Sequence, residues 1–383
     1  MNREEPYLST YLHAKGSRLG LPVSGNFELT SRCNFRCPMC YVHNGNEGMR
    51  ERELTADQWL GLAEEACRQG MVFALLTGGE PFIREDFFEI FDGMKRMGLL
   101  LSVNSNGSLL NDEIIERLAE DPPFRLNISL YGNSEETYYR MCGVSCHEKV
   151  INNIKALRAR GIDVRLNVSL TQYNAGDIGE ILQTAKELGV HIKTSAYMYP
   201  PRRLGGEPGK GNRMDPLEAA ETSVRYDRLR FSREEFKQRA ENMKKGICER
   251  EDCALDPSGE GMRCRAGSAS FWLTWDGRML PCGLMTAPEA YPLKTGFAAA
   301  WKEIREKTSE IKLPAACTSC AKRNICCICA AVNESETGGY NQPPEYVCRM
   351  TGEIARLTEL YAASDDGESL FRKEEHAEDR LGV

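Results

Sequence analysis

Three cysteines, Cys33, Cys37 and Cys40, lie close together in the segment CNFRCPMC. Their thiolates can hold three irons of a 4Fe–4S cluster, because such clusters are ligated by cysteine sulfur. The segment offers no ligand to the fourth iron, and an open position on a metal invites a substrate or a cofactor. The alternative is a zinc knuckle completed by His43 or by a remote cysteine. Zinc sites more often pair one CxxC with a second, distant pair, so we favour the cluster and name these residues the motif cysteines.

A second motif, TGGEP at residues 77–81, follows the apolar run VFALL, which is typical of a buried strand. Its two glycines allow the backbone to approach a ligand closely, and Glu80 can accept a hydrogen bond from an ammonium group. The letters GGEP recur at residues 205–208. That copy follows PPRRL rather than a strand, so we interpret it as part of a loop.

Both motifs resemble those of the radical S-adenosylmethionine (SAM) enzymes, in which CxxxCxxC and a following aromatic residue come after the first barrel strand. The resemblance implies that the motif cysteines carry the SAM-binding 4Fe–4S cluster and that TGGEP binds the methionyl amine. Two weaker candidates, Ser129 and Arg140, resemble residues that hold the ribose or carboxylate of SAM; otherwise they are a strand-end hydroxyl and a solvated helix arginine. The cofactor-binding residues implied are Tyr41, Gly78, Gly79, Glu80, Pro81, Asn104 (in the turn NSNG), Ser129 and Arg140.

The whole chain has 16 cysteines, and most of those outside the motif lie in its C-terminal half. The chain has neither the shortness nor the signal peptide of a secreted disulfide scaffold, which favours metal ligation. From residue 264 the spacing resembles the SPASM extension, a module with auxiliary 4Fe–4S clusters in many peptide-modifying radical enzymes. The resemblance implies one cluster on Cys317, Cys320, Cys326 and Cys348, and another on Cys264, Cys282 and Cys329, with Cys253 or Cys248 as candidate fourth ligands.

The match departs from the SPASM pattern at its last spacing. In the SPASM pattern a CxxxC pair that begins at Cys326 would end at residue 330, which is Ala in this chain. Cys329 stands one residue short of that position, so either Cys329 or Cys327 can supply the ligand. The alternative for the whole region is a pair of structural zinc sites. Near the expected mouth of the active site, Cys142 and Cys146 are either hydrogen-atom donors to a substrate radical or spare thiols.

A repeated pattern of helix, glycine and β-rich run positions these residues. Glycine accepts the left-handed conformation at a helix C-terminus, and the pattern occurs at Gly70, Gly98, Gly161 and Gly189. Strands alternating with amphipathic helices predict βαβ units and a parallel sheet. Six strands fit, the first at residues 26–30 and another at 126–132. We therefore expect an α/β fold with a partial (β/α)6 barrel, whose active site lies at the C-terminal strand ends.

Local signals mark several element boundaries. Thr55 with Gln58 predicts a capping box at the start of a helix. Asn111 predicts another helix start, and the segment SFWLTWDGRMLP predicts a hairpin that positions one cluster near the barrel mouth. The domains expected are a radical SAM core barrel (1–213), a helical linker (214–262), a small cysteine-rich SPASM domain (263–350), and a C-terminal helix with a charged tail (351–383).

The composition of the chain excludes some classes of partner and some cellular locations. The chain has 383 residues, a formal charge of −7, 41% hydrophobic and 27% charged residues, which excludes wholesale disorder. It lacks the roughly 18 uninterrupted apolar residues of a membrane span, and its N-terminus has no signal-peptide core. The acidic balance argues against duplex nucleic acid as a partner. We therefore expect a cytoplasmic protein with no membrane partner.

The resemblance implies that the reduced cluster passes an electron to SAM and that the resulting 5′-deoxyadenosyl radical abstracts a substrate hydrogen. The first expectation is modification of a peptide or protein, such as a thioether or other crosslink in a ribosomally made peptide. The alternatives are a small-molecule dehydrogenase or lyase, and a non-catalytic iron–sulfur electron carrier. Cys282 is followed by Gly283 and Leu284 rather than by Asp, which argues against formylglycine formation.

Two kinds of protein partner are expected. Reduction of the cluster calls for an electron donor such as flavodoxin or ferredoxin. The predicted barrel begins near residue 26, so a peptide substrate would need a separate leader-peptide-binding protein or a direct docking surface.

Overall fold

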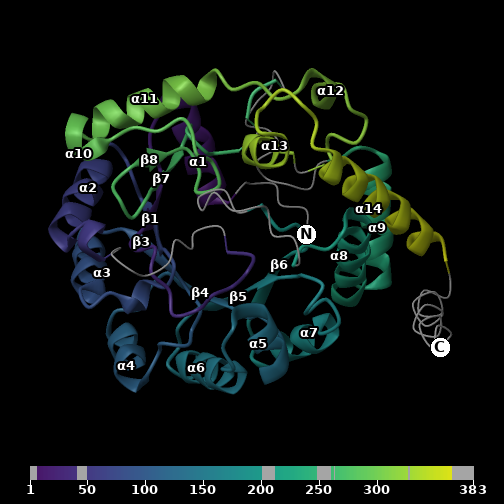
Figure 1. Cartoon of the computed structure of the whole chain (residues 1–383), viewed down its shortest axis with the longest axis horizontal. Coiled ribbons are helices and arrows are strands. Elements are labelled where there is room, and N and C mark those ends of the chain that lie inside the picture. Colours follow the sequence, from purple (N-terminus) through teal and green to yellow (C-terminus); the bar gives the residue numbers. More distant parts are fainter. Residues whose placement is uncertain are drawn as a thin grey trace.

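An arc of parallel strands, covered on its outer side by helices, forms the centre of the protein (Figure 1). The computed structural model describes residues 7–40, 50–200, 212–247, 260–262, 264–326 and 328–364. Six parallel strands follow one another in both sequence and space: β1 (Ser24–Glu28), β2 (Phe73–Thr77), β3 (Leu100–Ser105), β4 (Arg125–Ser129), β5 (Val164–Ser169) and β6 (His191–Ser195). The predicted α/β fold with a partial barrel is confirmed, although β1 begins two residues earlier than expected.

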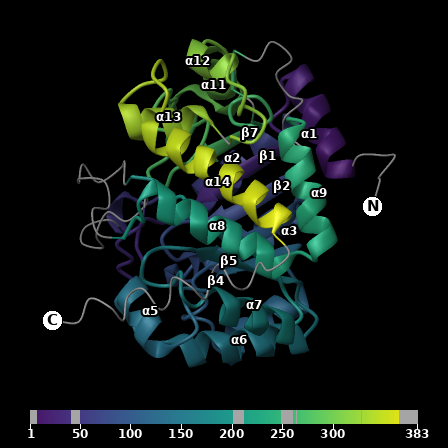
Figure 2. The same cartoon turned by 90° about the vertical axis from the view of Figure 1, so that its right-hand side faces the viewer.

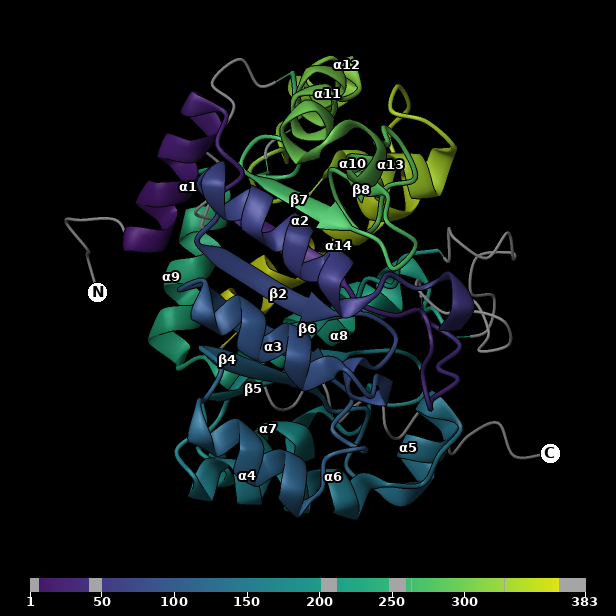
Figure 3. The ribbon, with the colours of Figure 1, turned by 90° about the vertical axis from the view of Figure 1, so that its left-hand side faces the viewer.

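Two of the helices between these strands begin at the caps that the sequence predicts. Thr55 and Gln58 form the predicted capping box of α2, and Asn111 caps α4 by accepting from the amide of Ile114. The helices are α2 (Ala56–Arg68), α3 (Phe87–Arg96), α4 (Asp112–Glu120), α5 (Glu135–Cys142), α6 (His147–Ala159) and α7 (Ile178–Glu187), with two 3-10 turns, η1 (Arg50–Arg52) and η2 (Pro81–Ile83). Figure 3 shows α2 and α3 lying across the outer face of β2.

Side chains of most strands alternate between an apolar outer face and a polar lumen, with a period of two; β2 is an exception, because its Phe73 and Leu75 lie on the lumen face. Phe27 of β1 is fully buried and its ring meets Trp59 of α2. On the lumen side, Asn127 donates to Asn104 over 2.9 Å, and Asn26 donates to the backbone oxygen of Phe271. The helices therefore pack on an apolar surface, whereas the inside of the barrel is lined by hydrogen-bonding groups.

The predicted hairpin in the C-terminal region is confirmed, but it belongs to the same sheet as the barrel. Its strands are β7 (Ser270–Leu273), which pairs in parallel with β1, and β8 (Met279–Leu280), which pairs antiparallel with β7. The sheet thus has eight strands in the order β6-β5-β4-β3-β2-β1-β7-β8. This pairing carries no motif in the sequence, because it joins the backbones of segments that lie far apart along the chain, such as those of Ser24 and Ser270.

Further helices lie around the arc of strands, and α11 (Phe297–Ser309) among them packs against α2 and β8 (Figure 1). Three of them, α8 (Pro216–Arg230), α9 (Arg233–Lys244) and α14 (Glu345–Ala363), pack against one another (Figure 2). A C-terminal helix was expected from residue 351, and α14 covers these positions but begins earlier, at Glu345. The others, besides α11, are α1 (Leu8–Leu19), α10 (Pro292–Thr295), α12 (Ala315–Thr318) and α13 (Ala330–Thr337). Within the described residues, no helix combines the length and the apolar character that crossing a membrane requires.

Candidate active site and cluster sites

The motif cysteines gather in the loop after β1, at the carboxyl end of the sheet. Burial raises the pKa of Cys33 to about 12, and the nearby charges of Glu80 and Cys40 add to the shift. A hydrogen bond with Cys142, followed by burial and the charge of Cys40, raises the pKa of Cys37. A bound metal favours the thiolate form of such buried thiols, because its positive charge compensates the negative charge left when the proton is released. The donor set therefore fits an iron–sulfur cluster.

The turn after β3 holds the motif loop in place through Asn106. Its side-chain amide donates to Asn34 over 2.9 Å and approaches the sulfur of Cys33 at 3.8 Å. Asn34 in turn donates to Ser108 over 2.8 Å. Asn104, the residue of NSNG predicted to bind the cofactor, lies in the lumen, where it donates to Thr77. The contact with the motif loop comes from Asn106 of the same segment, which was not predicted.

Glu80 lies fully buried directly after β2, close enough to Cys33 for their charges to interact. Its carboxylate accepts hydrogen bonds from the amide of Asn106 (2.7 Å), the hydroxyl of Ser105 (2.9 Å) and the amide of Phe82 (3.2 Å). Burial raises the pKa of Glu80 to about 7, and these hydrogen bonds oppose the shift. A cationic ligand beside this carboxylate would favour the ionised form, so Glu80 fits the ammonium partner expected from the sequence.

The glycines of TGGEP allow two loops to meet. A Cβ atom on Gly78 would lie 2.4 Å from the backbone oxygen of Thr30, and one on Gly79 would lie 2.3 Å from that of Arg32. Gly78 also has a φ of +149°, which side chains disfavour. The close approach forms the backbone hydrogen bonds from Gly79 to Thr30 and from Glu80 to Arg32. The glycines thus join the motif loop to β2, and their closeness to a ligand stays a prediction.

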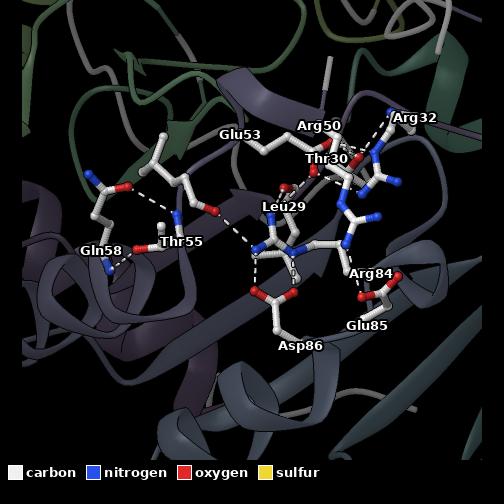
Figure 4. A network of polar contacts seen from close by, with 11 residues as sticks. Leu29, Thr30, Arg32, Arg50, Glu53, Thr55, Gln58, Arg84, Glu85 and Asp86 are labelled. Carbon is white, nitrogen blue, oxygen red and sulfur yellow. Dashed lines mark hydrogen bonds and ion pairs between the residues drawn. The ribbon is translucent and has the colours of Figure 1, made fainter. Parts of the chain in front are cut away.

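A network of buried charges fixes the start of the motif loop (Figure 4). The carboxylate of Glu53 accepts from both Arg32 (2.9 and 3.0 Å) and the hydroxyl of Thr30. Arg84 lies 3.6 Å from Glu53 and donates to Asp86 over 2.6 and 2.8 Å. It also donates to the backbone oxygens of Leu29 and Leu54. The loops after β1 and β2 are therefore held as one unit with the segment before α2.

A third group of residues, from the end of β4 and from α5, contacts the motif loop. The side chain of Tyr131, which follows β4, interacts with that of Cys37 and opposes the rise in the pKa of Cys37. Cys142 is fully buried, and its sulfur lies 3.1 Å from the backbone oxygen of Tyr138. Its own backbone oxygen accepts from Arg36 of the motif loop. Neither Tyr131 nor the contact of Cys142 with Cys37 was expected, because these residues carry no motif of their own.

The other expected cofactor residues are placed less centrally. Arg140 is exposed on α5, with its guanidinium 5.3 Å from the ring centre of Tyr173. Pro81 is buried at the start of η2. Cys146 is buried just before α6, and its thiol pKa is raised to about 12 by burial and the charge of Cys142. Tyr41, His43 and the second GGEP copy lie outside the described residues.

Four cysteines of the C-terminal region surround a cavity of about 300 Å³. They are Cys317, Cys320, Cys326 and Cys348, and the set is the one expected to hold an auxiliary cluster. Burial raises the pKa of Cys317, and the charges of the other three add to that shift. Among the described residues no three His, Cys, Asp or Glu side chains are placed to share a single metal ion. The thiols thus line the wall of a cavity, and soft sulfur ligands around such a space fit an iron–sulfur cluster.

The second auxiliary set is only partly brought together. Cys282 and Cys329 pack against the same apolar cluster around Met285. Cys329 caps α13 by accepting from the amide of Val332. Cys264 is partly buried ahead of β7. The candidate ligands Cys248, Cys253 and Cys327 lie outside the described residues.

The largest cavity described, about 800 Å³, lies between β6 and the helices α8, α9 and α14. At the carboxyl end of β6 its lining includes Ser195, Tyr197 and Tyr199. Tyr197 and Arg213 both bind the carboxylate of Glu336, which fixes that end of the wall. The cavity therefore extends along β6 to the end of the sheet at which the motif cysteines lie.

Comparison with known proteins identifies the family to which the part of the chain with the motif cysteines belongs. The model of the radical SAM superfamily matches residues 27–185. Residues 27–185 are a radical SAM domain. The AdoMet-dependent heme synthase of Methanosarcina barkeri is 24% identical to this chain, over 85% of the chain and 96% of its own length. A probable GTP 3',8-cyclase of Thermococcus kodakarensis is 34% identical over 46% of the chain and 57% of its own length.

The fold of the radical SAM enzyme extends beyond that domain. The crystal structure of Streptococcus suis SuiB bound to precursor peptide SuiA has a TM-score of 0.66 and 17% identity, over 91% of this chain and 83% of its own. The chain thus contains a radical SAM domain, shares its fold with SuiB along most of its length, and has a cysteine-rich C-terminal region. Its cofactors are SAM and a 4Fe–4S cluster.

Proposed function

We propose that this radical SAM enzyme removes a hydrogen atom from a small organic molecule bound in the 800 Å³ cavity beside β6. When bound, SAM and the reduced cluster supply hydrogen-atom abstraction. The chain itself supplies a partly open cavity, whose volume falls within the roughly 300–1,000 Å³ of small-molecule sites. The observation that carries the proposal is that this cavity reaches the carboxyl end of the sheet, where the motif cysteines and Glu80 lie.

The proposal assigns roles to the cysteines. The motif cysteines hold the SAM-binding cluster, and Glu80 receives the amino group of SAM. Cys317, Cys320, Cys326 and Cys348 hold an auxiliary cluster in their own cavity. The likeness to a heme synthase along nearly its whole length supports a small-molecule substrate.

Peptide modification, such as formation of a thioether or another crosslink, is the second candidate. It is supported by the fold shared with SuiB, whose structure contains a precursor peptide. On this alternative a few residues of a peptide would occupy the cavity. A leader-peptide-binding protein would then join the expected electron donor, flavodoxin or ferredoxin, as a partner in the cytoplasm.

Hydrogen abstraction can be tested without knowing the substrate. Cells grown in deuterated medium provide an extract, which ultrafiltration divides into small-molecule and peptide fractions. The anaerobically reconstituted enzyme, SAM and dithionite are added, and the 5′-deoxyadenosine formed is analysed for deuterium by mass spectrometry. Deuterium from the small-molecule fraction is the expected result. Deuterium from the peptide fraction alone would favour the second candidate, and none from either would overturn hydrogen abstraction.

A further inference from the structure

The 800 Å³ cavity has a basic end, formed where β4, β5 and β6 begin. Its lining there includes Arg125, Arg165, His191 and Lys193, which we name the basic floor. Arg125 and Arg165 share the lumen face with Asn127, which is the register partner of Arg165. His191 is in turn the partner of Arg165 on β6. Four basic side chains from three neighbouring strands are therefore brought to one place by the register of the sheet.

The positive charge of this end is only partly neutralised by the protein. Arg125 pairs with Asp163 over 2.7 Å. In the ranges that the structure describes, no carboxylate lies within ion-pair distance of Arg165 or Lys193. Burial and the charge of Arg125 lower the pKa of Arg165, which Asp163 opposes. Arginines that repel one another inside a cavity are stabilised by an anionic ligand.

The helices opposite the sheet add two further arginines. Arg230, near the end of α8, and Arg239 of α9 also line the cavity. Arg239 pairs with Asp227 over 3.1 Å, and Asp227 is the one acidic residue among those described around this cavity. The excess of positive charge thus extends from the strands to the facing wall.

The other end of the cavity has a different character. It is lined by the aromatic rings of Tyr197 and Tyr199 and by Leu170, Val332 and Met350. Ser195 lies four positions after His191 on β6, which at a rise of about 3.3 Å per residue corresponds to roughly 13 Å. The cavity therefore offers basic groups at one end and an apolar, aromatic surface toward the motif cysteines.

We propose that this cavity binds an elongated organic oxyanion, whose carboxylate or phosphate groups contact Arg165, Lys193 and Arg125. Guanidinium groups bind both kinds of oxyanion through paired hydrogen bonds. The body of the ligand lies between β6 and α14, against Tyr197 and Tyr199, and its far end reaches the carboxyl end of the sheet. Its role as the substrate rests on the proposed function, whereas its binding does not.

Binding is measured on the cluster-loaded enzyme with SAM and without reductant, so that no turnover occurs. The probes are benzene-1,2,4-tricarboxylate and inorganic tripolyphosphate, with benzene-1,2,4-tricarboxamide as the uncharged control, and the method is isothermal titration calorimetry. The first two probes distinguish carboxylate from phosphate as the preferred group. We expect at least one of the two anions to bind. If the tricarboxylate is the preferred anion, the triamide should bind at least tenfold more weakly than it does.

The variant R165Q/K193Q removes the two floor cations that have no described carboxylate partner. We expect about a tenfold or greater loss of affinity for the preferred anion, because charge-assisted hydrogen bonds are lost. The matched control, R160Q/K186Q, removes the same charges from outer helices and should bind within twofold of the unaltered enzyme. Iron content and circular dichroism verify folding. If R165Q/K193Q does not fold, the single variant K193Q on the exposed edge strand and the charge-preserving R165K replace it.

Several results would overturn the inference. They are the absence of binding by both anions, equal affinity of R165Q/K193Q and the control variant, and binding of the triamide as tightly as the anions. The proposed function has its own outcome in the deuterium experiment. Anion binding without deuterium transfer would retain the site and reject hydrogen abstraction, whereas transfer without anion binding would do the reverse.

Discussion

The raised pKa of Glu80 leads us to expect that the affinity of the enzyme for SAM depends on pH. The carboxyl group can attract the ammonium of SAM only when ionised, and its pKa is raised to about 7 because it is fully buried. Below that pH the group is mostly protonated and neutral. Affinity should therefore rise as the pH rises toward 7, and bound SAM should lower the pKa of Glu80 in return.

The size of the effect follows from the fraction of Glu80 that is ionised. With a pKa of about 7, that fraction rises from about a tenth at pH 6 to about a half at pH 7. The affinity for SAM should thus increase about fivefold over this interval. The rise in affinity with pH should end near pH 8, because the α-amino group of the ligand loses its own proton with a pKa of about 7.7–8.0.

Equilibrium dialysis of labelled SAM against the cluster-loaded, unreduced enzyme measures this dependence. The variant E80Q should bind SAM about tenfold more weakly at pH 7, since a charge-assisted hydrogen bond is lost, and should show no rise between pH 6 and 7. The variant S105A keeps the carboxylate but removes a hydrogen bond that lowers the pKa of Glu80. Its rise in affinity should therefore lie at higher pH. A flat profile for the unaltered enzyme, or the same slope in E80Q, would refute the reasoning.

Four further outcomes are expected. Replacing all three motif cysteines by Ala should abolish 5′-deoxyadenosine formation yet leave about eight irons per chain, four per auxiliary cluster; full cleavage activity would contradict the assignment. C317A should lose about four irons relative to the unaltered enzyme, and bound zinc instead of iron would argue for a structural zinc site. E53Q leaves Arg84 and its neighbours short of a buried negative charge and should lower the free energy of unfolding by about 3–5 kcal/mol, so an unchanged thermal midpoint would count against the network. Y131F removes the hydroxyl that interacts with Cys37 and should lower the reduction potential of the SAM-binding cluster, because a polar group beside the sulfur stabilises the reduced state. An unmoved potential in an EPR-monitored titration would exclude this effect.

The parts of the fold that could be predicted are those set by short segments. Gly70 and Gly161 end helices with a positive φ, as their position before β-rich runs indicated. The capping box at Thr55 depends on residues three apart, and the hairpin of β7 and β8 on a turn at Gly277. Each signal is local, so the sequence alone was sufficient.

The features that could not be predicted depend on which segments meet in space. Asn106 and Tyr131 contact the motif loop from other strands, and nothing in their own segments distinguishes them from turn or core residues. The basic floor arises because Arg165 and Lys193 both lie on the lumen face, which the register of the strands decides. The residues that position a site are thus harder to predict than the motif at its centre.

The pairing of β7 with β1 has a consequence for synthesis on the ribosome. The strand that precedes the motif cysteines has one edge covered by β2, but its other edge waits for Ser270–Leu273. During translation the whole six-stranded arc emerges before that edge is covered, and an uncovered edge strand can pair with other chains. A nascent or prematurely terminated chain ending before β7 would therefore be prone to aggregation at the strand that leads into the active site.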